Sequence, residues 1–196
     1  MDSRRRILDA LRAASPPAPG APDLSGVGVR FDDPVAQLAD AIAAVAGRLV
    51  RVPDRARLAD AVAALAAELG AARVASTVAG VPGDVDLGQV TDAHALDGVG
   101  LAVVPGAFAV AENGAVWVPG ETLRPRGIFV VAEHLALVVP AGEIVHDMHE
   151  AYRRLSFPGP AFGTFIAGPS KTADIEQALV IGAHGARSCT VLLAGA

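Results

Sequence analysis

The sequence has little cysteine, no excess of positive charge and no long apolar run. Cys189 is the only cysteine among 196 residues. The chain therefore cannot form an internal disulfide, and it cannot hold an iron–sulfur cluster or a cysteine-rich zinc site with its own thiols. Lysine and arginine number 16 against 21 aspartates and glutamates, which gives a formal net charge of −5. This balance argues against a nucleic-acid partner, because phosphate backbones are bound by basic surfaces.

A membrane-spanning segment is not expected, although 52% of the residues are hydrophobic. The uncharged run from Gly98 to Ala111 is broken by glycine and proline, whereas a spanning helix needs about 20 consecutive apolar residues. The basic residues near the N-terminus are followed by further charges at Asp9 and Arg12, so no secretory leader is expected. These features predict an acidic globular protein of the cytoplasm that carries no cofactor.

The chain divides into an N-terminal arm, residues 1–32, and one α/β domain, residues 33–196. In the arm, a short amphipathic helix over Ser3–Ala14 precedes a segment rich in proline. The apolar stripe of this helix favours docking on a neighbour, which makes a homo-oligomer through the arm one possibility.

Within the domain, helices alternate with continuous apolar strands, as is typical of a three-layer fold with a largely parallel sheet flanked by helices. Several strands and no long helix between Val99 and Val139 predict an antiparallel or hairpin insertion. Helices are expected over Pro34–Ala46, Asp54–Leu69, Glu143–Leu155 and Thr172–Ile181, and strands over Leu49–Val52, Arg73–Val78, Val99–Val104, Ala115–Val118, Ile128–Val131, Leu135–Val139, Thr164–Ala167 and Cys189–Leu193.

The first candidate site is Glu112-Asn113-Gly114. Glu112 is the only acid between Asp97 and Glu121 and lies between two apolar stretches. We expect a partly desolvated carboxylate there, which would suit a base or a nucleophile. The alternative is an ordinary hairpin turn, since Asn-Gly is a favoured turn pair.

The second candidate is the loop Gly168–Thr172, placed between an expected strand and an expected helix. Free N–H groups at the helix start, together with Lys171, would suit an anion. In the alternative interpretation, Ser170 or Thr172 caps the helix and Asp174 lies in its first turn. The spacing of a Walker A loop is absent.

Two further segments carry histidine. His146 shares an expected helix face with His149, Glu150 and Arg153, which indicates a solvated polar face rather than a metal site, so no metal ligands are assigned. His184 follows the last expected helix. It either complements the helix dipole or faces the same cleft as the Gly168 loop, because loops at one edge of an α/β sheet converge.

The strings Gly-Pro-Ser-Lys-Thr-Ala-Asp-Ile-Glu from Gly168 and His-Gly-Ala-Arg-Ser from His184 resemble the C-terminal signature of the LUD-domain family, the relatives of lactate-utilisation protein C. The N-terminal helix and the Glu112 element are also similar, so the resemblance covers nearly the whole chain. Two departures suggest a side branch. Ala186 stands where members usually have proline, and Glu112-Asn113 replaces a commoner small-polar pair.

This resemblance implies a fold similar to the sugar-isomerase and CoA-transferase group. It also implies a bacterial accessory subunit in L-lactate oxidation that works beside an iron–sulfur protein. Glu112-Asn113-Gly114 is similar, in addition, to the Ser-Glu-Asn-Gly element of class I CoA-transferases, in which the Glu is the nucleophile.

The leading hypothesis is an accessory or regulatory subunit for oxidation of lactate or a related organic acid. Its cleft would be formed by Glu112, Asn113, Gly114, His184 and the loop of Gly168, Ser170, Lys171, Thr172 and Asp174. The alternative is a stand-alone enzyme acting on a CoA thioester or a phosphorylated small molecule. In that case Glu112 would be the nucleophile or base, and His184 would relay a proton. Whether the chain is an enzyme stays open, and a scaffold joined through the arm is a third hypothesis.

Overall fold

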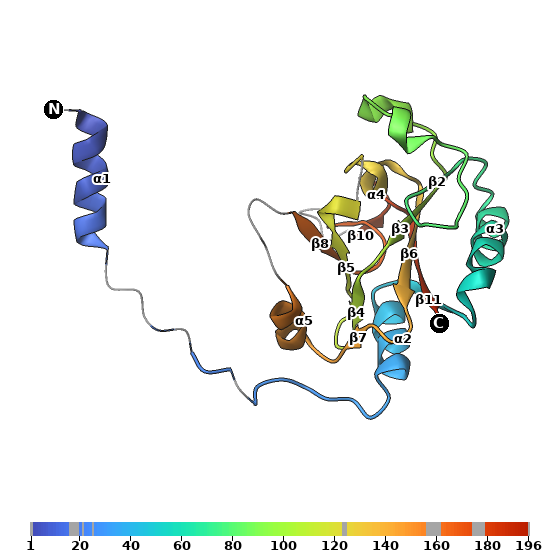
Figure 1. The fold of residues 1–196 in the computed structure, drawn as a ribbon, viewed down its shortest axis with the longest axis horizontal. Helices are drawn as coiled ribbons and strands as arrows, with labels where there is room; N and C mark the ends of the chain where they lie inside the picture. Colours follow the sequence, from blue (N-terminus) through green and yellow to red (C-terminus); the bar gives the residue numbers. More distant parts are fainter. Residues whose placement is uncertain are drawn as a thin grey trace.

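The structure is a computed structural model that describes residues 2–15, 20, 22–24, 26–122, 125–155, 162–173 and 179–195. Figure 1 shows its arrangement, with the central strands seen between helix α3 (Leu58–Leu69) on one side and helices α2 (Pro34–Ala44) and α5 (Met148–Arg154) on the other. Among the described residues, no helix combines the length and the apolarity needed to cross a membrane.

The centre of the domain is a five-stranded sheet in which every pair of neighbours is parallel. The strand order is β1-β11-β6-β3-β2. The central strands β3, β6 and β11 are almost fully buried and largely apolar because both faces of the sheet are covered, whereas the edge strand β1 has exposed arginines at Arg48 and Arg51. The bounds of the five strands are Arg48–Val52 for β1, Val74–Ser76 for β2, Leu101–Pro105 for β3, His134–Pro140 for β6 and Ser188–Ala194 for β11.

Helix α3, Leu58–Leu69, covers one face of this sheet, where Val62 and Leu65 pack against strand residues such as Val103. The helix ends at Gly70, whose φ of +65° places it in the left-handed region, as the sequence predicts for a helix stop. Helix α2, Pro34–Ala44, packs on the opposite face. Asp33 caps its N-terminus by accepting two backbone N–H groups.

A second sheet lies on the same side as α2, and its strand order is β7-β4-β5-β8. It contains the expected antiparallel insertion, and together with α2 it makes the third layer. Helix α5, Met148–Arg154, packs on its outer face through Ala151. The bounds are Phe108–Val110 for β4, Val116–Pro119 for β5, Ile144–Val145 for β7 and Gly163–Ile166 for β8. The predicted three-layer α/β class is thus confirmed.

Three predicted elements are wrong. Ile128–Val131 is one turn of helix, α4, because its apolar run packs Ile128 fully into the core and suits either secondary structure. The expected helix Glu143–Leu155 is divided into β7 and α5, because Asp147 caps a new helix start. The described ends of the expected helix Thr172–Ile181 lie instead in two antiparallel strands, β9 and β10, and residues 174–178 lie outside the described residues. The bounds of these strands are Lys171–Ala173 and Leu179–Ile181.

The described residues also include short 3₁₀ helices. These are η1 Arg55–Arg57, η2 Leu87–Gln89, η3 Ala93–Leu96 and η4 Gly120–Thr122.

The arm contains helix α1, Ser3–Ala14, with the predicted bounds, and none of its residues is buried. Residues 26–31, here called the strap, contact the domain itself. The Val29 N–H donates to Asp147 Oδ2 over 2.8 Å, and the Phe31 N–H donates to His146 Nδ1 over 3.1 Å. The last part of the predicted arm is therefore attached to the loop between β7 and α5.

Candidate functional site

Glu112 lies in the turn between β4 and β5, and its side chain is exposed. Its Oε2 atom accepts the N–H of Met148 over 3.0 Å, and its own N–H donates to the His146 carbonyl over 3.1 Å. The expected desolvation of this carboxylate is wrong, because the turn reaches the surface beside α5. These contacts connect the turn to the start of that helix.

Asn113 and Gly114 form the tight turn that the Asn-Gly pair predicts. Asn113 Oδ1 accepts the N–H of Ala115 over 3.0 Å, and the φ of Gly114 is +72°. A Cβ atom on Gly114 would lie 2.9 Å from the backbone nitrogen of Ile42 in α2. Glycine is therefore needed here for its conformation and for the close approach of a helix.

The Gly168 loop and His184 converge, which is one of the two alternatives that the sequence leaves open for His184. Both line a cavity of about 270 Å³, and the Ser170 N–H donates to the Ala186 carbonyl over 2.9 Å. The other residues that line this cavity are Phe129, Val130, Leu135, Thr164, Phe165, Ile166, Ala167, Pro169 and Gly185. Leu135 lies at the start of β6 and Ala186 lies two residues before β11, so the cavity is at the amino ends of the parallel strands.

The expected helix start at Thr172 is absent, because this residue lies in the middle of β9. No helix N-terminus thus faces an anion at Thr172. The Lys171 ammonium donates to the carbonyl of Val45, the C-cap residue of α2, where a cation complements the end of the helix. Thr172 is half-buried, and Asp174 lies outside the described residues.

His146 is not on the helix face that the sequence predicts, because it precedes the cap residue Asp147. Its Nδ1 atom accepts the strap N–H, so a neutral ring carries its hydrogen on Nε2, and its backbone N–H donates to Glu150 over 2.9 Å. Within the described ranges, no three histidine, cysteine, aspartate or glutamate side chains are close enough to hold a metal ion.

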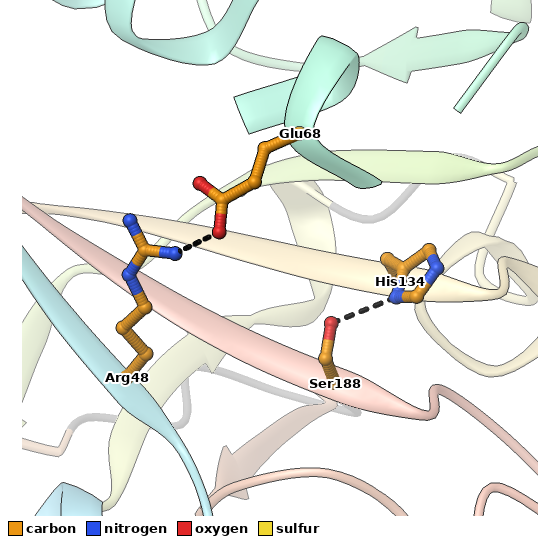
Figure 2. Close-up of polar contacts among 4 residues, drawn as sticks. All are labelled: Arg48, Glu68, His134 and Ser188. Atoms are coloured by element: carbon orange, nitrogen blue, oxygen red, sulfur yellow. Dashed lines mark hydrogen bonds and ion pairs between the residues drawn. The ribbon is translucent and has the colours of Figure 1, made fainter. Parts of the chain in front are cut away.

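A histidine–serine pair was missed by sequence reasoning. His134 Nδ1 lies 2.8 Å from Ser188 Oγ, and the two residues are register partners at the starts of β6 and β11 (Figure 2). Figure 2 also shows the ion pair between Arg48 and Glu68, which joins β1 to the last turn of α3. Neither His134 nor Ser188 lines a cavity described in this section, so the pair is explained as a cross-strand contact.

A second cavity, here called the crevice, lies at the opposite edge of the parallel sheet and holds about 240 Å³. Residues that end or follow all five parallel strands line it. Arg55 and Leu58 follow β1, and Val78 follows β2. The remaining lining residues are Pro105 at the end of β3 and Gly106 after it, Val138 and Pro140 in β6 with Ala141 and Gly142 after it, and Ala194 at the end of β11 with Gly195 after it.

The crevice was not predicted from the sequence, because its lining is mostly apolar or glycine and comes from five separate segments. The available signal was the set of glycines just after predicted strands, at Gly106, Gly142 and Gly195. Open α/β sheets bind ligands outside the carboxyl ends of their strands, so the crevice is the better candidate for a ligand site.

The fold and these cavities define a three-layer α/β protein with a small crevice at the carboxyl edge of a parallel sheet. The comparison with family models defines a narrower class than the fold does. Residues 99–194 match the family model described as the LUD domain, so the resemblance to the LUD-domain family is confirmed for that part of the chain. It contains β3, β6 and β11, the three central strands of the sheet.

The chain is also similar to curated proteins called Lactate utilization protein C. It is 31% identical to the one from Shouchella clausii over 92 residues, and 30% identical to Lactate utilization protein C 1 from Bacillus mycoides over 95 residues. These alignments cover 44% and 43% of this chain, and 40% and 39% of the relatives. The chain thus matches about two fifths of the length of those relatives.

A solved structure shares the fold. The crystal structure of a DUF162 family protein from Deinococcus radiodurans superposes with a TM-score of 0.58, covering 83% of this chain and 96% of that one at 20% identity. This likeness extends the common architecture beyond residues 99–194.

Proposed function

We propose that this chain is an accessory subunit in the utilisation of lactate or a related small organic acid, and that it binds the acid without carrying electrons. The observation that supports this most is the convergence of all five strand ends on one crevice. Its volume of about 240 Å³ is below the 300–1,000 Å³ of pockets for drug-sized ligands. It therefore suits a small metabolite, and the names of the relatives supply the chemical class.

The environment of Cys189 supports a role without electron transfer. This only cysteine is buried in β11, and burial raises the pKa of its thiol to about 12. Iron–sulfur clusters are bound by thiolates, and a buried, protonated thiol is unsuited to that task. The electron acceptor in this proposal is a separate iron–sulfur protein.

The alternative, a CoA-dependent enzyme with Glu112 as nucleophile, has weaker support. The Glu112 carboxylate is exposed, accepts the N–H of Met148 and lies outside the lining of both cavities. These contacts favour a structural role for it.

The test is an add-back assay in extracts of a bacterial strain from which the gene has been deleted. We expect the deletion to abolish lactate-dependent dye reduction, and we expect the purified full chain to restore it. Cys189→Ala should restore it equally. Dye reduction by the purified chain alone, normal activity in the deletion strain, or failure of a folded Cys189→Ala protein would each overturn the proposal.

A further inference from the structure

We propose that Arg55 binds the carboxylate of a short monocarboxylic acid in the crevice, and that Gly142 sets the size of the acid admitted. This inference rests on the proposed function for the class of ligand. Its geometry comes from the crevice alone.

Arg55 is the only charged residue among those that line the crevice. It begins η1, where Asp54 Oδ1 accepts the N–H of Ala56 over 2.8 Å and so holds the backbone on which the arginine is carried. None of the ion pairs in the described part of the chain involves Arg55. Its guanidinium is therefore available to a ligand.

The single positive charge of the crevice favours a ligand that carries one carboxylate. A guanidinium presents two parallel N–H groups that match the two oxygens of a carboxylate. The remaining lining is apolar or glycine, so a second carboxylate on the same ligand would lose water without gaining a partner. The apolar side chains Leu58, Val78 and Val138 suit the hydrocarbon part of the acid.

Gly142 differs from the two other glycines of the crevice. A Cβ atom on Gly106 would lie 2.3 Å from Val116 Cγ1, and one on Gly195 would lie 2.1 Å from the Pro53 carbonyl oxygen. A Cβ atom on Gly142 meets no atom within 4 Å, and its φ is not in the left-handed region. A side chain at this position can therefore be added at the rim of the crevice without displacing protein atoms.

The experiment is calorimetric titration of the full chain with L-lactate, pyruvate and butyrate, with neutral lactamide and dianionic malonate as comparison ligands. We expect Arg55→Gln to weaken binding of the monocarboxylates at least about tenfold, the scale of a lost charge-assisted pair. Arg57→Gln is the matched control, because Arg57 lies in the same 3₁₀ helix, is exposed and does not line the crevice. It should change affinity less than about twofold.

Gly142→Leu should weaken the binding of butyrate more than that of lactate, because butyrate is the longer acid. Gly142→Ala should leave the binding of both acids intact. Circular dichroism and the thermal midpoint check that each variant is folded. The inference is overturned if wild type binds none of the monocarboxylates, if lactamide binds as well as lactate, or if Arg55→Gln binds like wild type. Restored dye reduction with unchanged Arg55→Gln binding would refute this inference and leave the proposed function standing. If binding depends on Arg55 but the chain does not restore dye reduction, the proposed function is refuted and this inference stands.

Discussion

Replacing Asp147 with alanine should destabilise the domain by about 2–4 kcal/mol. This carboxylate is only 5% exposed, and it accepts the Glu150 N–H over 2.7 Å and the strap Val29 N–H over 2.8 Å. Loss of the helix cap at Glu150 typically costs about 1 kcal/mol. Loss of the bond from the Val29 N–H to this charged group costs about 1.5–3 kcal/mol more. Alanine removes both acceptors and leaves two N–H groups to find water.

The pH dependence of this effect has a definite sign. The backbone N–H of Glu150, opposed by burial and assisted by the Val29 N–H, holds the pKa of Asp147 below its ordinary value of 3.8. A lowered folded pKa stabilises the fold above the unfolded pKa, and this contribution is lost as pH falls through the folded value. The stability difference between wild type and Asp147→Asn should therefore persist at pH 7 and shrink below about pH 4.

The assay measures the free energy of unfolding in urea at pH 7 and below about pH 4, together with the hydrogen-exchange rate of the Val29 amide. Asp33→Ala is the control, because Asp33 caps α2 with two backbone acceptor bonds but is exposed, and it should cost about 1 kcal/mol. The reasoning is refuted if Asp147→Ala costs no more than this control, or if the Val29 amide exchanges at the wild-type rate.

Two further predictions concern the turn and the buried thiol. Gly114→Ala should cost about 2 kcal/mol or more in urea unfolding, because the left-handed φ and the approach to Ile42 both oppose a side chain. Gly80→Ala, at a φ of +81° with no atom within 4 Å, should cost only about 1 kcal/mol; equal costs would exclude the close contact as a cause. Cys189, with its pKa raised to about 12, should react with Ellman's reagent at pH 8 only as fast as the protein unfolds, and rapid labelling of the native protein would contradict its burial.

Local signals in the sequence predicted the strongest elements of the fold. Asp33 before Pro34 marked the start of α2, and Gly70 marked the end of α3. Apolar periodicity failed to predict the secondary structure of a short apolar segment. Ile128–Val131 is an apolar run of four residues, too short for periodicity to distinguish a strand from a helical turn.

The candidate site was harder to predict, because its position depends on which end of each strand faces which cavity. A cleft shared by Gly168 and His184 was one of two alternatives for His184, and the two residues do line one cavity, because β9 and β10 pair antiparallel. That cavity, however, is at the amino edge of the parallel sheet. Arg55 carried no local signal, because an arginine in a charged segment at a helix start is unremarkable until the strand order is known. Long-range register, rather than composition, decides where the crevice lies.

The pairing of β1 with β11 has a consequence for biosynthesis. β1 is the first strand of the sheet in the sequence, and its hydrogen-bonding neighbour is the last, with Arg48 opposite Thr190. During translation β1 therefore emerges long before its partner, and an unpaired strand edge is a template for association with other chains. Nascent chains of this protein should thus depend on chaperones until the ribosome has released β11, and the parallel closure of the sheet should be a slow, late step of folding.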